Sequence, residues 1–307
     1  MISVRDLHKH YGTARAVDGL SFEVRPGHVT GFLGPNGAGK STTMRMIMGL
    51  DAPSSGTATV NGRPYRDIHR PMFEVGAVLE ARAVHGGRSA FNHLLCLAQS
   101  NGIGPRRVRE VLELVGLDGV ARRRAQGFSL GMAQRLGLAV ALLGDPPVLL
   151  CDEPVNGLDP EGILWIRTLL RRLAEEGRTV LVSSHLMSEM ALTADHVVVI
   201  AQGRLLAEGP TAQIIAHGAV SEVTLRSPQA AAFSPVLQLA GADVSPGGDG
   251  PETLRITGLS AVRVGELAAQ RHITLHELTT RAPSLEEAFM ALTRSHLDFQ
   301  IAEANAS

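Results

Sequence analysis

Residues 34–42 read Gly34-Pro35-Asn36-Gly37-Ala38-Gly39-Lys40-Ser41-Thr42. Two glycines five positions apart, followed by Lys and Ser, form the pattern of a phosphate-binding loop. Glycines let the backbone curl until several N–H groups point at one phosphate, and a helix that follows adds the positive end of its dipole. We expect Lys40 to reach the β and γ phosphates of a nucleotide and the Ser41 hydroxyl to bind Mg²⁺.

The neighbouring sequence distinguishes this loop from an ordinary glycine-rich turn before a lysine. The apolar run VTGFL at 29–33 predicts a buried strand that enters the loop, and residues 42–50 have the spacing of a helix that leaves it. A strand, a glycine loop and a helix in this order are the context that phosphate binding requires.

A second apolar run ends in two carboxylates. Residues 148–153 read VLLCDE, which predicts a buried strand that delivers Asp152 and Glu153 to the edge of a sheet. Asp152 is therefore the candidate Mg²⁺ ligand, and Glu153 is the candidate general base for an attacking water. A strand that merely ends in a polar turn is the alternative for these two residues alone.

Composition excludes several classes of protein. The chain has 307 residues, 44% of them hydrophobic, with 29 basic and 30 acidic side chains, so it is long and apolar enough to bury a large core. The net charge of -1 argues against nucleic acid as a partner bound by bulk electrostatics. Among the basic residues only Lys9 and Lys40 are lysines, so a lysine in the phosphate loop is informative, whereas Lys9 has no evident role.

The two cysteines and the apolar segments bear on the cellular setting. Cys96 and Cys151 fit no metal-ligand spacing, which favours reduced thiols in the cytosol. The N-terminus carries charges where a signal peptide needs an apolar stretch, and the most apolar segment, 136–151, is interrupted by Gly, Asp and two prolines. We therefore expect no membrane span in this chain.

Hydrophobic periodicity divides the chain into two domains, 1–218 and 219–307. In the first, an antiparallel hairpin is expected from 2–11 and SFEVR at 21–25, a strand near 53–63, and a further strand at 179–184 after a helix at 163–176. A mostly helical subdomain is expected at about 84–145, where apolar residues recur every three or four positions.

The second domain has the pattern of a small α+β unit. Strands are expected at 222–226, 242–245, 253–257 and 273–278, and helices at 230–240, 261–271 and 285–293. This βαββαβ order resembles a ferredoxin-like unit with an additional helix. The closing segment, 284–289, reads SLEEAF and is consistent with an amphipathic helix that only packs this domain.

The order of motifs resembles the ATP-binding subunit of an ATP-binding cassette (ABC) transporter. GPNGAGKST is followed by FSLGMAQR at 128–135, LLCDEPVNGLDP at 149–160 and His185 after VLVSS, and the resemblance covers about residues 2–215. It implies an α/β P-loop NTPase core with antiparallel β and α-helical subdomains. It also implies ATP hydrolysis with ATP and Mg²⁺ as cofactors.

The resemblance assigns roles to residues outside the loop. Tyr11 would stack on adenine with Val17 beside it, His185 would contact the γ phosphate, and Asp159 would lie in a loop that crosses a dimer interface. Ser129 and Gly131 would bind the γ phosphate of a nucleotide held by a second copy. Each has a structural alternative: Tyr11 as a half-buried hairpin aromatic, His185 as a satisfied histidine, and Ser129 as an ordinary helix cap.

Two positions depart from the common family pattern. Leu130 stands where the signature usually has glycine, so it adds a side chain where the backbone approaches a neighbour. Glu80 stands where a glutamine usually faces Mg²⁺ and the membrane partner; it can accept from metal-bound water but adds a negative charge, and a solvated surface glutamate is its alternative. With the SLEEAF ending, these substitutions resemble the bacitracin- and daunorubicin-type branch of bacterial drug-export ATPases.

The resemblance implies a subunit at the cytoplasmic face of the membrane. Two copies would bind head to tail around two ATP molecules and power a separate integral-membrane permease that exports a drug-like compound. A permease helix would dock near residues 80–95. A soluble ABC ATPase that acts on ribosomes or nucleic acid, and a regulatory ATPase, are the alternatives.

Overall fold

The computed structural model describes residues 1–80, 84–218, 222–248, 250–281 and 284–293. The chain forms two units, Met1–Thr211 and Ala212–Ser307. This division falls a few residues before position 218, where the sequence places it, because the helix α7 (Thr211–Gly218) begins at the junction. In the described part of the chain, no helix is long and apolar enough to cross a membrane.

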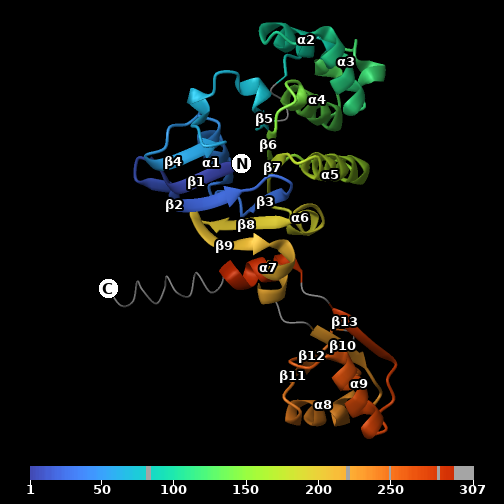
Figure 1. Cartoon of the computed structure of the whole chain (residues 1–307). Helices are drawn as coiled ribbons and strands as arrows, with labels where there is room; N and C mark the ends of the chain where they lie inside the picture. The colour runs from blue at the N-terminus through green and yellow to red at the C-terminus, as the bar shows by residue number, and fades with distance from the viewer. Residues whose placement is uncertain (81–83, 219–221, 249, 282–283, 294–307) are drawn as a thin grey trace. The chain divides into compact units, whose positions relative to one another are not determined.

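A six-stranded sheet forms the centre of the first unit (Figure 1). Its order is β5-β6-β7-β3-β8-β9, and every pair is parallel except β8 with β9. The strands are β3 (Val29–Leu33), β5 (Val75–Val78), β6 (Val148–Asp152), β7 (Thr179–Ser184), β8 (His196–Ala201) and β9 (Arg204–Pro210). Because β3, β6 and β7 run in parallel, the residues that follow them meet at one edge of the sheet.

A three-stranded antiparallel sheet covers this centre. Its order is β2-β1-β4, with β1 (Ile2–Tyr11), β2 (Ala14–Val24) and β4 (Ser55–Val60). The predicted second strand of the hairpin, 21–25, is too short, because β2 pairs with β1 from Ala14 onward and leaves only a tight turn. Gly12 occupies this turn at a φ of 59°, a conformation that favours glycine.

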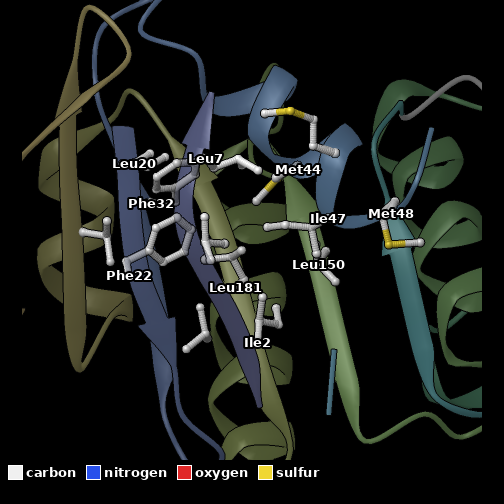
Figure 2. Close-up of a cluster of buried hydrophobic side chains, with 14 of the residues drawn as sticks. Ile2, Leu7, Leu20, Phe22, Phe32, Met44, Ile47, Met48, Leu150 and Leu181 are labelled. Carbon is white, nitrogen blue, oxygen red and sulfur yellow. The ribbon is translucent and has the colours of Figure 1, made fainter. Parts of the chain in front are cut away.

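The main hydrophobic cluster lies between the two sheets and α1 (Lys40–Ile47), as Figure 2 shows. Phe22 of β2 stacks on Phe32 of β3 with ring centroids 5.2 Å apart, and Ile47 of α1 is fully buried beside them in the same cluster. A buried side chain of this size contributes about 1.5–3 kcal/mol of transfer free energy. The strand before the phosphate loop and the helix after it are therefore both anchored in the core.

The helices of the first unit confirm the predicted helical segment. α2, α3 and α4 contact one another, and α4 also contacts β5 (Figure 1). In α3 the apolar positions Val108, Val111 and Leu112 are buried, as their spacing predicts. Besides α1, the described residues of this unit form the α-helices α2 (Ala90–Ser100), α3 (Pro105–Leu114), α4 (Leu130–Leu142), α5 (Pro160–Glu175) and α6 (Met187–Thr193).

The second unit has the antiparallel order β11-β12-β10-β13, which is the order of a ferredoxin-like βαββαβ unit. Phe233 and Val264 of its helices pack with Val223, Leu225 and Ile256 of the sheet. Residues 285–293 are helical. The elements are β10 (Glu222–Arg226), α8 (Ala230–Leu239), β11 (Asp243–Pro246), β12 (Thr253–Thr257), α9 (Ala261–Gln270) and β13 (Glu277–Arg281).

One strand of the second unit is placed too early by the sequence. Residues 273–278 are predicted to form a strand, but β13 begins only at Glu277. The N–H of Ile273 instead donates to the carbonyl of Ala268 at 2.9 Å and closes the end of α9. Ile273 and Leu275 pack against the core from this connection, so their apolar character reflects burial without strand pairing.

The cysteines are free thiols in the structure. Cys96 is half-buried in α2, and Cys151 is fully buried in β6. Burial raises the pKa of Cys151 to about 12, so this thiol stays protonated and unreactive.

Candidate functional site

The glycines of the phosphate loop are required by close backbone contacts. A Cβ on Gly34 would lie 2.4 Å from the carbonyl oxygen of Ile200, and a Cβ on Gly39 would lie 2.5 Å from that of Ala16. Gly37 has a φ of 80°, and no atom lies within 4 Å of where its Cβ would stand, so its backbone conformation is what demands glycine. The loop is a cradle that side chains at Gly34 and Gly39 would disrupt.

Lys40 is held at the start of α1, two residues before the position at which the sequence predicts the helix. Its side chain is only 6% exposed, and Nζ donates to the carbonyl oxygens of Gly34 at 2.7 Å and Pro35 at 3.3 Å. Nζ also lies 3.4 Å from Oε1 of Glu153. The single charge of the loop is thus desolvated and directed to the sheet edge.

Glu153 meets this lysine because β3, β7 and β6 are neighbouring parallel strands, and Asp152 lies opposite Ser183 in the register of β6 with β7. The buried Ser183 hydroxyl donates to Oδ1 of Asp152 and accepts the N–H of Glu153 at 2.9 Å. Glu153 has a φ of 49°, an uncommon conformation for a residue with a side chain. Ser183 therefore fixes both carboxylate residues at the turn where β6 ends.

His185 completes the cluster around Glu153. Its Nδ1 lies 2.9 Å from Oε2 of Glu153, while Lys40 faces the other oxygen. A carboxylate only accepts hydrogen bonds, so Nδ1 carries the hydrogen in this contact. The Glu153 side chain is 20% exposed and that of His185 is 36% exposed, so solvent reaches a carboxylate that is fixed from two sides.

The candidate metal ligands lie on one cavity of about 530 Å³. Ser41, Asp152 and Glu80 all line it, together with Arg45 from α1. A hydroxyl and carboxylates are oxygen donors of the kind that Mg²⁺ prefers, so the donor set fits this ion. Residues 81–83, which belong to the segment expected to meet the permease, lie outside the described residues.

Tyr11 stands at the end of β1 and is 51% exposed. Its hydroxyl donates to Oδ2 of Asp51 at 3.3 Å, and Nζ of Lys9 lies 4.9 Å from the ring centroid. Lys9 is fixed in turn by a 2.7 Å hydrogen bond to the carbonyl of Ala52. Desolvation and the Asp51 carboxylate raise the pKa of Tyr11 above its usual value, so the phenol stays neutral.

Val17 packs against the phosphate loop. Its side chain is fully buried, and its Cγ2 lies 3.3 Å from where a Cβ of Gly39 would stand. The side chain presents no surface to a ligand, so its contribution in this structure is to pack beneath the loop.

Ser129 and Gly131 lie at the start of α4, beside a second cavity of about 340 Å³ that Ser129 lines. Ser129 lines this cavity and caps α4, where its hydroxyl oxygen accepts the N–H of Met132 at 3.3 Å. The cap leaves the O–H free to donate elsewhere. Asp159 caps α5 in the same manner by accepting the N–H of Gly162 at 2.9 Å. These residues do not join Lys40 and Glu153 within the chain.

Ser183 and Lys9 are the contributors that sequence reasoning missed. Two serines at the end of the otherwise apolar run 179–184 were the signal for Ser183, because a buried hydroxyl needs a partner. Lys9 was the other lysine of an arginine-rich chain, but only the folded hairpin shows that it faces Tyr11.

Comparison with known proteins agrees with this geometry. Residues 17–156 match the ABC transporter family, and residues 221–286 match a family described as a domain of unknown function, DUF8746. The bacitracin transport ATP-binding protein BcrA of Bacillus licheniformis is 42% identical over 213 residues, which cover 68% of this chain and 70% of BcrA. The lantibiotic transport ATP-binding protein SrtF of Streptococcus pyogenes is 34% identical over 208 residues, covering 68% of this chain and 90% of SrtF.

A solved structure extends the comparison to three dimensions. An ATP-binding subunit of an ABC transporter superposes with a TM-score of 0.64 at 28% identity, covering 71% of this chain and 92% of that one. The phosphate loop, the paired carboxylates and His185 of this chain thus lie on a fold shared with such a subunit. The chain belongs to the ABC transporter family of ATP-binding subunits, and it is an ATPase of that family.

Proposed function

We propose that this chain is the ATP-hydrolysing subunit of an exporter for an antibiotic-like compound, bound at the cytoplasmic face of the membrane to a separate permease. The observation that carries the proposal is Glu153, whose two oxygens face Lys40 and His185 at the edge of the sheet. The transport activities named for BcrA and SrtF support the class of cargo.

Glu153 acts as the general base. Its carboxylate is fixed by Lys40, His185 and the backbone bond to Ser183, yet it remains open to solvent, so it can orient a water and accept its proton. Lys40 provides a compact positive charge for the β and γ phosphates, and the glycine cradle provides backbone N–H groups. Preorganised charge of this kind stabilises the transition state for phosphoryl transfer without reorganisation.

Mg²⁺ would be held by Ser41 and Asp152, with Glu80 accepting from its water shell. When bound, the ion neutralises charge on the phosphate oxygens. Ser183 keeps the Asp152 carboxylate in a fixed orientation through its hydrogen bond.

A second copy completes each site. Ser129 does not line the cavity that holds Ser41 and Asp152, and in the proposed head-to-tail dimer it reaches the γ phosphate of the nucleotide bound by the other copy. Asp159 follows Glu153 in the same turn-rich segment and lies at this interface in the proposed dimer. Tyr11 stacks on adenine. ATP binding then stabilises the closed dimer, and loss of the γ phosphate destabilises it.

Purification of the full chain from detergent-solubilised membranes tests the transport assignment. We expect an equimolar multi-span membrane protein in the complex, identified by mass spectrometry, and ATP turnover that responds to bacitracin-like peptides added to the reconstituted complex. Lys40→Ala is the matched control, because it should retain the membrane partner and lose turnover. The proposal would be overturned if the chain were recovered without a membrane protein and bound to ribosomes or nucleic acid that nuclease treatment removes.

A further inference from the structure

The start of α4 and the loop before α5 are joined by reciprocal packing of leucine on glycine. A Cβ placed on Gly157 would lie 2.6 Å from Cδ2 of Leu130, and a Cβ placed on Gly131 would lie 3.6 Å from Cδ2 of Leu158. Each leucine therefore covers the glycine beside the other leucine. We refer to Leu130, Gly131, Gly157 and Leu158 as the interlock.

The interlock connects two functional segments of the same chain. Leu130 directly follows Ser129 and begins α4. On the other side, the N–H of Asn156 donates to the carbonyl of Glu153 at 3.2 Å, and the N–H of Leu158 donates to that of Val155 at 3.3 Å. These successive turns make the segment after Glu153 compact, so a displacement at Leu158 is transmitted toward Glu153.

A second contact joins α4 directly to α5. The guanidinium of Arg135 in α4 lies 4.1 Å from the ring centroid of Trp165 in α5, and Nη1 of Arg135 donates to the carbonyl of Val115 at 3.1 Å. Arginine over an aromatic face restricts both side chains through a favourable electrostatic contact. α4 is consequently fixed against the loop before α5 at its first residues and against α5 itself at Arg135.

We propose that Leu130 is a positioning residue. It holds the loop 156–159, and through this loop Glu153, in a fixed position relative to Ser129. A glycine at position 130 would lack the side chain that covers Gly157, and any side chain at 157 would displace Leu130. The leucine at the start of α4 and the glycine in the loop before α5 thus form one complementary contact. The inference rests on the proposed function in one respect: Ser129 serves a nucleotide bound by the second copy, so one contact links the two sites of the dimer.

A double-mutant cycle in the full chain tests the interlock. The variants are Gly157→Ala, Leu130→Ala and the double variant, with Gly102→Ala as the control for backbone strain. Gly102 has a φ of 71°, close to the 69° of Gly157, but no atom lies within 4 Å of where its Cβ would stand. Gly102→Ala therefore introduces the same left-handed strain without the clash.

The expected result is a split between ATP binding and turnover. Gly157→Ala should lower kcat about tenfold and leave the equilibrium affinity for ATP unchanged, whereas Gly102→Ala should leave kcat unchanged. Adding Leu130→Ala should restore kcat to within about twofold of the Leu130→Ala single variant, because the clash is gone. Leu130→Met, which keeps a flexible side chain of similar volume, should retain most of the activity.

Two results would overturn the interlock: a double variant whose loss equals the product of the single losses, or a Gly157→Ala variant as active as Gly102→Ala. Thermal melting of each variant separates these outcomes from a folding defect. If Gly157→Ala does not fold, the comparison of Leu130→Ala with Leu130→Met carries the test: kcat should be lower in Leu130→Ala at unchanged ATP affinity, and equal kcat in these two variants would overturn the proposal. ATP-dependent dimerisation of the Glu153→Gln chain is measured in parallel. Its loss would remove the proposed two-copy site, whereas an additive cycle in a chain that dimerises would remove only the interlock.

Discussion

Replacement of Ser183 with alanine removes one atom that holds both carboxylate residues. The hydroxyl donates to the Asp152 carboxylate, a hydrogen bond with a charged partner worth about 1.5–3 kcal/mol. It also accepts the N–H of Glu153, for about 1 kcal/mol more. Ser183→Ala should therefore destabilise the first unit by about 3 kcal/mol, which corresponds to a fall of about 6–12 °C in Tm for a domain of this size.

Ser184→Ala is the matched control, because Ser184 is equally buried and is the next residue of the same strand. Among the side-chain hydrogen bonds of the described residues, its hydroxyl takes part in one, in which it accepts the N–H of Leu186 at 2.9 Å. Loss of this bond should cost about 1 kcal/mol, or about 2–4 °C in Tm.

The two variants should differ in activity as well as in stability. If about 1.4 kcal/mol of the Ser183 contribution acts on the transition state, Ser183→Ala lowers kcat about tenfold, and the Mg²⁺ concentration for half-maximal turnover rises because Asp152 loses its orientation. Calorimetry and steady-state ATP turnover at varied Mg²⁺ measure both effects. Equal Tm and equal kcat for the two variants would refute the assignment of Ser183.

Three other predictions follow from the site and the fold. Lys40→Ala should weaken equilibrium ATP binding by about tenfold or more, because a buried charge directed at the phosphates is lost, and undiminished affinity would contradict the phosphate-loop assignment. Lys9→Met should raise KM for ATP about two- to fivefold with kcat unchanged, since the cation above Tyr11 is removed; steady-state kinetics with an unchanged KM would exclude this role. The hydrogen bond from Arg204 lowers the pKa of Asp18 in the folded state. Wild type should therefore be more stable than Asp18→Asn at pH 7, and this difference in stability should vanish as the pH falls below about 4, through the folded-state pKa of Asp18. Denaturant unfolding at several pH values measures this difference, and a difference that persists at low pH would contradict it.

The sequence predicts the part of the site that follows from strand order. An apolar run before Gly34, another before Asp152 and a third before His185 predict parallel strands whose carboxyl ends meet, and the structure brings Lys40 and Glu153 within 3.4 Å. Local patterns suffice there because buried strands are apolar and the residue that follows each one is polar.

Local sequence patterns do not predict contacts that depend on strand register or that join two segments far apart in the sequence. Ser183 bonds Asp152 only because β6 and β7 pair in one particular register. Leu130 is predicted to add a side chain where the backbone approaches a neighbour, and only the folded structure shows that its partner within the chain is Gly157 in the loop before α5. The early placement of the strand at 273–278 has the same origin, since Ile273 is apolar for packing and not for pairing.

Steady-state ATP turnover by Glu153→Gln, measured with equilibrium ATP binding on the same full chain, tests the central claim most directly. Glutamine keeps the size of the side chain and an oxygen for His185, but it cannot accept the proton of an attacking water. We predict that turnover falls to background while ATP binding and ATP-dependent dimer formation persist. Unchanged turnover would show that Glu153 is not the base and that the site described at the edge of the sheet does not work as proposed.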